Sequence, residues 1–358
     1  MEKLDLIAPD DMHCHLRDGV LLDHVIFETA RQFKRAVIMP NLTQPVIDGA
    51  RAAAYQQRIM SSLEQQAMIH NRSDIAAEFT PLMTLYVTDQ SDPQEYKRAF
   101  LAGEAIAAKL YPANATTNSA HGVRDIFALK PLFSMMSDLG MPLLIHGEVT
   151  ASEIDIFDRE AVFIEQVLKP LRAEFPALRM VLEHITTAQA ADFIGDSDDP
   201  NLAATITPHH MMLNRNALFQ GGIRPDHYCL PILKRETHRA AILAAATSGH
   251  PRIFAGTDSA PHTKSAKLQP CGCAGIYNAF EAIGLYAELF ENENCLHHLE
   301  GFTSINGANF YGLPQNKARI TLVKQPIAVP EYFEIEQPSG KDYITPLRAG
   351  KTIAWRHA

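Results

Sequence analysis

Two histidines stand one residue apart near the N-terminus, within the run of residues 11–17. In a β-strand, residues two apart point to the same face, so His13, His15 and Arg17 would project together. Two imidazoles on one face can chelate a metal ion, and a neighbouring guanidinium can hold an anion through two parallel hydrogen bonds. This run therefore indicates a metal site with an anion-binding group beside it.

Other chemically capable residues stand where stretches of β-forming residues end: Asn41, Lys109, His146, His184 and Asp258. Each has an ordinary explanation when taken singly. A lysine can extend to solvent, a histidine can satisfy a backbone carbonyl, and an aspartate can cap a helix. Because so many of them share the same position at a strand end, we interpret the set, together with His13 and His15, as one site.

The apolar strand around Lys109 disfavours a charged amine, and a neutral amine can react with carbon dioxide. The resulting carbamate is an anion that can bridge two cations. The ligands that we expect for two zinc ions are His13, His15 and Asp258 for one, and His146 with His184 for the other. A hydroxide between the ions would attack an amide-like carbonyl, and Asp258 is placed to shuttle its proton.

Eight short β-forming stretches alternate with segments of helical periodicity, such as that marked by Ile126, Leu129 and Phe133. The stretches are 4–7 continuing towards His15, 36–39, 82–87, 105–111, 142–146, 180–184, 202–206 and 252–258. Eight strand-helix units in about 260 residues predict an α/β fold with a closed (β/α)8 TIM barrel. The alternative is a doubly wound open sheet, but no glycine-rich phosphate turn follows the first stretch.

The chain has 358 residues, and we expect one domain over 1–358. Its barrel core would cover about 4–310, followed by a short C-terminal packing extension over about 311–358, where prolines separate short extended pieces. The polar segment 64–78 is expected to be a surface excursion. Barrel enzymes place their chemistry at the carboxyl ends of the strands, which agrees with the positions of the candidate residues.

The net charge of −9 and the lack of a basic run argue against a nucleic-acid partner. No apolar stretch reaches the length of a membrane span, so we expect no membrane association. Five cysteines, an odd number, suit a reducing compartment, and we expect a cytoplasmic protein. Cys271 and Cys273 are better explained as loop thiols than as a metal-binding pair, because no matching pair exists.

The motifs are similar to those of the dihydroorotases of the amidohydrolase superfamily, in particular the compact, single-barrel, dimeric type. The runs that carry the resemblance are 11–18, 39–42, 107–112, 146–148, 183–187, 229–234 and 256–262. The resemblance implies a hydrolase acting on cyclic amides, which interconverts N-carbamoyl-L-aspartate and L-dihydroorotate in de novo pyrimidine biosynthesis. It also implies a small-molecule substrate and a homodimer.

The resemblance implies the following metal ligands: His13, His15, a carboxylated Lys109, His146, His184 and Asp258, with Asp258 also the acid and base. The implied substrate contacts are Arg17 and Asn41 for the carboxylate, with His262 and the Ala274 backbone nearby, and the Leu230 backbone for the ring amide. His15 and His146 would touch the substrate as well as the metals. Residues 112–119 resemble a mobile lid that closes through the hydroxyls of Thr116 and Thr117.

Two rival functions stay open. Another cyclic amidohydrolase, such as a hydantoinase or allantoinase, would share the metals, but Arg17, Asn41 and His262 favour an anionic substrate. A catalytically inactive barrel that serves as a scaffold would be expected to have lost ligands, and all six are present.

Some conspicuous residues are left out of the predicted ligand set. The doublets 209–210 and 297–298 are expected to be poor chelators with surface or structural roles, because adjacent residues in a strand face opposite ways. Glu148 and Glu183 flank predicted ligands and are expected to orient them.

Overall fold

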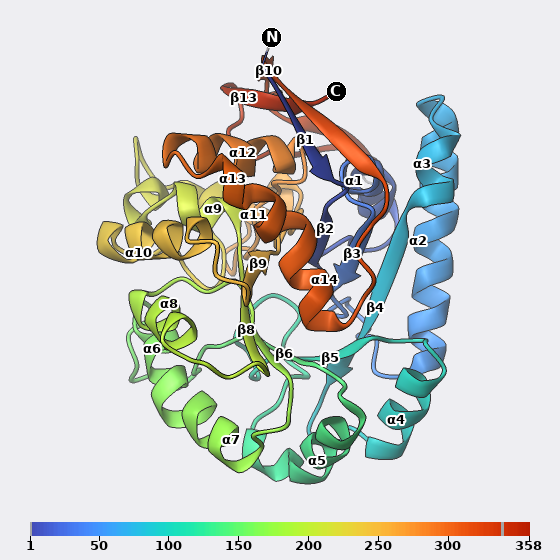
Figure 1. Ribbon diagram of the computed structural model, residues 1–358. Helices are drawn as coiled ribbons and strands as arrows, with labels where there is room; N and C mark the ends of the chain where they lie inside the picture. Colours follow the sequence, from blue (N-terminus) through green and yellow to red (C-terminus); the bar gives the residue numbers. More distant parts are fainter. Residues whose placement is uncertain (1, 338–339) are drawn as a thin grey trace.

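The computed structural model describes residues 2–337 and 340–358. Its centre is an eight-stranded parallel sheet with strands in sequence order, and helices surround it (Figure 1). The strands are β2 (Asp10–Cys14), β3 (Arg35–Ile38), β4 (Thr80–Val87), β5 (Ala107–Leu110), β6 (Leu143–Ile145), β7 (Met180–Leu182), β8 (Leu202–Ile206) and β9 (Ile253–Ala255). The predicted TIM barrel is confirmed.

The two ends of the sheet meet just beyond β9. Cys14 and Ser259 form a parallel bridge, and the Asp258 amide donates to the carbonyl of His13 at 2.8 Å. The first and last strands are therefore joined at their carboxyl ends, where the candidate site residues stand.

Helices lie in the connections between the barrel strands, and further helices come after the last barrel strand, β9. They are α1 (Val20–Ala30), α2 (Gly49–Ile69), α3 (Ser73–Glu78), α4 (Pro93–Leu101), α5 (Lys130–Leu139), α6 (Arg159–Phe163), α7 (Lys169–Glu174), α8 (Ala188–Gly195), α9 (Pro208–Met212), α10 (Glu236–Thr247), α11 (Lys264–Lys267), α12 (Ala282–Asn292), α13 (Leu296–Glu300) and α14 (Asn306–Tyr311). Short 3-10 turns cover Ile126–Leu129, Arg215–Leu218 and Pro225–His227, and π turns cover Ile164–Leu168 and Gly301–Ile305. The polar segment 64–78 is largely helical, formed by the end of α2 and by α3.

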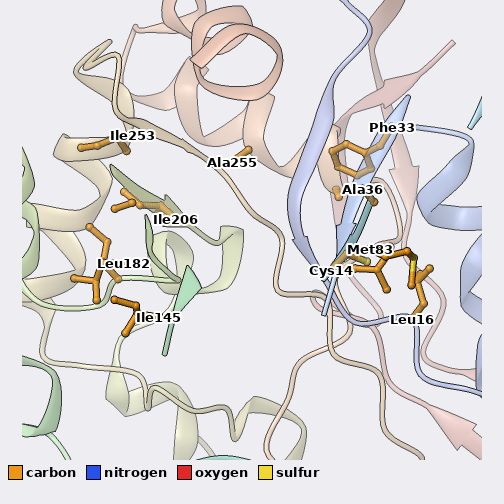
Figure 2. Close-up of a cluster of buried hydrophobic side chains, with 14 of the residues drawn as sticks. Cys14, Leu16, Phe33, Ala36, Met83, Ile145, Leu182, Ile206, Ile253 and Ala255 are labelled. Carbon is orange, nitrogen blue, oxygen red and sulfur yellow. The ribbon is translucent and has the colours of Figure 1, made fainter. Parts of the chain in front are cut away.

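Two layers of apolar side chains hold the barrel together. Met12, Val37, Leu144 and Phe254 belong to one cluster that fills the interior. Strand residues of the opposite face pack against the helices, and Figure 2 shows Ile145 among them. Because both faces of each strand are buried, the strands appear in the amino-acid sequence as short continuous apolar runs.

The first predicted strand is wrong in one respect, because it is two strands. Lys3–Ile7 forms β1, which pairs antiparallel with β10 (Arg319–Ala328) in a separate three-stranded sheet that also contains β13 (Thr352–His357). Pro9 stands between β1 and β2, and proline has no amide hydrogen with which to continue a ladder. The barrel therefore begins at Asp10.

The predicted C-terminal extension contains the strands β10, β11 (Phe333–Gln337), β12 (Gly340–Ile344) and β13. The strand β13 packs on α12. The N and C labels in Figure 1 both lie beside the sheet formed by β1, β10 and β13. Trp355 is fully buried there. None of the helices among the described residues has both the length and the apolar character that a membrane-spanning helix needs.

Gly284 on α12 lies directly against the Trp355 backbone, so a methyl group there would overlap the Trp355 carbonyl. We predict that Gly284→Ala lowers the free energy of unfolding by about 1–3 kcal/mol, as overpacking does. The control is Gly195→Ala on α8, where an added methyl meets no atom within 4 Å and helix propensity favours alanine. Urea unfolding measures both variants, and equal effects would contradict this packing.

Candidate metal centre

The six predicted ligands lie together at the carboxyl ends of the barrel strands and are all buried. The His13 ring is 5.2 Å from that of His15 and 5.0 Å from that of His184, centroid to centroid. The rings of His146 and His184 are 4.9 Å apart. Histidines up to 171 positions apart in the chain therefore form one cluster.

Three ligand atoms in this cluster nearly touch. The Nε2 atoms of His13 and His15 are 3.3 Å apart, and Asp258 Oδ1 lies 3.4 Å from the first and 3.0 Å from the second. Zinc bonds of about 2.0–2.1 Å in tetrahedral geometry separate neighbouring ligand atoms by about 3.3 Å. The three atoms therefore fit the coordination shell of one metal ion.

Carboxylates fix two of the histidine rings. Glu183 Oε2 lies 2.7 Å from His13 Nδ1, and Glu148 Oε2 lies 2.7 Å from His146 Nε2. Because an ionised carboxylate only accepts hydrogen bonds, each contacted nitrogen carries the proton and the other nitrogen keeps its lone pair for a metal. Burial is the largest influence on the pKa of His13 and lowers it, but the charge and hydrogen bond of Glu183 together with the contact to Asp258 make the net shift upward. Both glutamates thus lie where orienting residues were expected.

Lys109 is fully buried on β5, and its Nζ atom has no hydrogen-bond partner among the described residues. Burial lowers the pKa of this amine to about 8, although the charges of Glu183 and Asp258 oppose the shift. An uncompensated buried ammonium is costly, so the setting favours a neutral or chemically modified amine. This agrees with the carbamate expected at Lys109, which stays a prediction.

Backbone strain and a β-bulge position the ligands. The pairing of β2 with β3 shifts between Asp11 and Cys14, and β2 ends at Cys14. Simple alternation along one strand was therefore the wrong reason for expecting His13 and His15 to converge, although they do converge. His184 and Asp258 have φ values of 42° and 45°, a left-handed conformation that is unfavourable outside glycine.

Asp11 was missed as a site residue, and so was Thr205. The Asp11 carboxylate accepts hydrogen bonds from the amides of His13 and Thr257 and from the Thr257 hydroxyl, and so joins the first strand to the segment after β9. Burial raises its pKa to about 6. Thr205 donates to Glu183 Oε2 at 2.5 Å. Asp11 adjoins the histidine motif, which was a usable signal, but no local pattern marks Thr205.

A pocket opens beside the cluster, and the predicted substrate residues line it, except for His262. Those that line it are His15, Arg17, Asn41, Thr116, Thr117, His146, Leu230 and Ala274. His262 lies behind Arg17, with its Nε2 2.8 Å from an Arg17 guanidinium nitrogen, and lines the larger outer cavity. Burial and the neighbouring Arg17 hold the pKa of His262 well below its usual value, so His262 is neutral, and its Nε2 also lies 3.0 Å from the Ala274 carbonyl.

Arg17 is buried and forms no ion pair with a carboxylate among the described residues. Its Nε donates to the Pro261 carbonyl at 3.1 Å, and its backbone has a φ of 60°. Tyr55 holds the Arg17 carbonyl through a hydrogen bond of 2.5 Å. A buried guanidinium whose contacts are neutral favours an anionic ligand.

The predicted lid, residues 112–119, contacts the pocket, and Thr116 and Thr117 line it. The Thr117 hydroxyl contacts the Ala274 amide and carbonyl at 3.0 and 3.3 Å. The Asn41 side chain donates to the Thr117 carbonyl, and the Asn118 side chain donates to the Asn41 carbonyl. The predicted lid is therefore hydrogen-bonded to Asn41 and Ala274, which both line the pocket.

The histidine doublet 209–210 is buried on the helix α9, so the strand geometry assumed for it was wrong. His209, His210 and Cys229 are close enough to form a second potential metal-binding group. Both ring nitrogens of His210 already contact protein oxygens, Thr207 Oγ1 at 2.8 Å and the Pro231 carbonyl at 2.9 Å. These contacts give His210 a structural role.

The sequence profile of the Amidohydrolase family matches residues 6–329, and the chain belongs to this family of barrel hydrolases. The chain is 54% identical to the dihydroorotase of Aromatoleum aromaticum over 356 residues, which cover 99% of each protein. Two solved dihydroorotases share its fold over nearly their whole length. The Saccharomyces cerevisiae enzyme, in complex with 5-fluoroorotic acid, has a TM-score of 0.89 and 30% identity, covering 100% of this chain and 99% of the other. The Campylobacter jejuni enzyme has a TM-score of 0.86 and 35% identity, with 99% and 97% covered.

The contact between Glu183 and His13 generates a prediction about metal affinity. Glu183→Gln removes the negative charge that holds the His13 ring, so metal affinity should fall about 10–100-fold. Thr205→Val removes only the hydroxyl that supports Glu183 and should cause a smaller loss. Its matched control is Thr247→Val, whose hydroxyl donates within α10. Competition with a chelator measures the affinities, and an unchanged affinity in Glu183→Gln would show that Glu183 does not support the site.

Proposed function

We propose that this protein is a metal-dependent dihydroorotase, which reversibly cyclises N-carbamoyl-L-aspartate to L-dihydroorotate and water in pyrimidine biosynthesis. The observation that carries the proposal is the position of Arg17, a buried cation without a carboxylate partner among the described residues. It lines the same pocket as four of the six clustered ligands, namely His15, His146, His184 and Asp258. A substrate that is both a cyclic amide and a carboxylate satisfies both features. The full-length similarity to dihydroorotases supports the same activity.

We propose two zinc ions per chain, with His13, His15 and Asp258 at one, His146 and His184 at the other, and a carboxylated Lys109 bridging them. The short spacing of the first three ligand atoms supports the first ion. The buried Nζ of Lys109 and the buried, unpartnered Nδ1 of His184 support the rest of the site. Bound zinc ions would polarise the amide carbonyl and lower the pKa of a water molecule towards neutrality.

Asp258 would move the proton in both directions of the reaction. Burial raises the pKa of Asp258, but the neighbouring histidines His13, His15 and His184 together outweigh burial and hold this pKa well below its usual value. Asp258 is thus ionised at neutral pH and can accept a proton from the attacking water during ring opening. Ring closure requires the protonated form, which helps to expel water.

The opposite end of the pocket would recognise the substrate carboxylate. Arg17 offers the charged fork, while Asn41 and His262 lie beside it. The backbones of Leu230 and Ala274 would hold the ring amide, and Thr116 and Thr117 would close the lid. A hydantoinase or allantoinase would have no use for a carboxylate clamp, and an inactive scaffold would have no need of six intact ligands.

We also propose that the protein works as a homodimer in the cytoplasm. The resemblance to the compact dimeric dihydroorotases supports the dimer. All five cysteines lie within the described residues and are free thiols, which supports a reducing compartment.

The purified protein should open the ring of L-dihydroorotate and contain about two zinc ions per chain, as a bridged dinuclear site requires. Removing the metal with a chelator should abolish turnover, and added zinc should restore it. Ring opening is followed by ultraviolet absorbance, and metal is measured by elemental analysis. Full activity in the metal-free protein would contradict the proposed chemistry.

Arg17→Lys keeps the charge but loses the planar fork. We predict that transition-state stabilisation for dihydroorotate falls by about 1.5–3 kcal/mol, the scale of a hydrogen bond to a charged group. Dihydrouracil, which has the ring but no carboxylate, should be affected much less. The kcat/KM values for both substrates measure the effect. Equal losses would show that Arg17 does not recognise the carboxylate.

The Asp258→Asn variant should keep part of its metal. Its rates of ring opening and of ring closure should each fall at least about 10²-fold, which is the lower end of the range for a positioned general acid and base. In the unmodified protein, ring closure should be faster at mildly acidic pH and ring opening at alkaline pH, because ring closure consumes a proton and ring opening releases one. Parallel pH profiles for the two directions, or an active Asp258→Asn variant, would refute this role.

A further inference from the structure

Tyr111 lines the substrate pocket and has a buried hydroxyl that none of the roles assigned above uses. It directly follows β5, two positions after Lys109, and its side chain lines the pocket with Arg17 and Asp258. Its exposed fraction is 1%, and its hydroxyl has no hydrogen-bond partner among the described residues. Such a group in a pocket indicates a missing ligand, because a buried unsatisfied hydroxyl is unfavourable.

Four other buried tyrosines of this chain do not share this feature, although Tyr311 does. The hydroxyl of Tyr55 donates to a backbone carbonyl, and so do those of Tyr86, Tyr96 and Tyr286. The orphan hydroxyl of Tyr111 is therefore not a general property of the packing.

The surroundings of Tyr111 fix its ring. The ring stacks on Tyr86 at 5.2 Å, lies 6.1 Å from the His146 ring, and has Lys109 Nζ 4.9 Å from its centroid. A phenol held in this way is a preorganised hydrogen-bond donor.

We propose that Tyr111 is a further catalytic residue, whose hydroxyl donates a hydrogen bond to the oxygen of the ring amide carbonyl as that carbonyl is attacked. This inference rests on the proposed dihydroorotase function. In ring opening, the water oxygen bonds to the carbonyl carbon, the bond from that carbon to the ring nitrogen breaks, and the nitrogen receives a proton. Negative charge gathers transiently on the carbonyl oxygen. Tyr111 stabilises it without giving up its own proton.

The test is Tyr111→Phe, which keeps the ring packing and removes only the hydroxyl. The matched control is Tyr311→Phe. The Tyr311 hydroxyl is also buried without a partner, but Tyr311 packs against Phe254 inside the barrel and does not line the pocket. For each variant, kcat and KM are measured with dihydroorotate, zinc is measured by elemental analysis, and 5-fluoroorotic acid binding is measured by calorimetry.

We expect Tyr111→Phe to lower kcat about 10²-fold, the scale of one lost donor to a developing charge. Zinc content, KM and the affinity for 5-fluoroorotic acid should change less than about threefold, because this donor acts on charge that only the transition state carries. Tyr311→Phe should keep the normal kcat.

An unchanged kcat in Tyr111→Phe would overturn the inference. So would a loss of zinc from this variant, or a fall in its affinity for 5-fluoroorotic acid as large as the fall in kcat. An equal kcat loss in Tyr311→Phe would overturn it too. Each of these results leaves the dihydroorotase assignment intact, whereas a zinc-loaded unmodified protein without turnover would contradict that assignment itself.

Discussion

The burial of charged and metal-binding groups at one end of the barrel is the constraint on which the rest of this structure depends. Arg17, Lys109 and Asp258 are all buried there, and an uncompensated buried charge costs several kcal/mol. Protein contacts meet only part of this cost, since Arg17 has neutral partners and the Lys109 amine has none. Metal ions, a carbamate and an anionic substrate would each offset the remainder. The left-handed backbone at His184 and Asp258 is a further cost that the barrel tolerates to hold these groups in place.

Much of this arrangement could be predicted from the sequence, because it follows from repeated local rules. Parallel strands buried on both faces appear as short apolar runs, and eight such runs with helices between them favour a closed barrel. The barrel rule then places strand ends at one mouth. His146 and His184, which are 38 positions apart, could be assigned to one site for this reason alone.

The rest depends on contacts that no local pattern encodes. Pro9 separates β1 from the barrel strand β2, and β1 joins a second sheet. The strand with which β1 pairs there, β10, lies more than 300 residues further along the chain. The bulge in β2 replaces simple alternation, since the pairing with β3 and not the spacing sets which way each side chain points. Thr205 supports Glu183 from a neighbouring strand, and the orphan hydroxyl of Tyr111 can be recognised only once its surroundings are known.

The central claim is that this cavity holds two metal ions bridged by a modified Lys109. Crystals of the protein, purified without chelator and measured at the zinc absorption edge, test it most directly. The account predicts two anomalous peaks, one among His13, His15 and Asp258 and the other beside His146 and His184, with electron density extending from Lys109 Nζ between them. A single peak, or a bare lysine amine beside the metals, would contradict it.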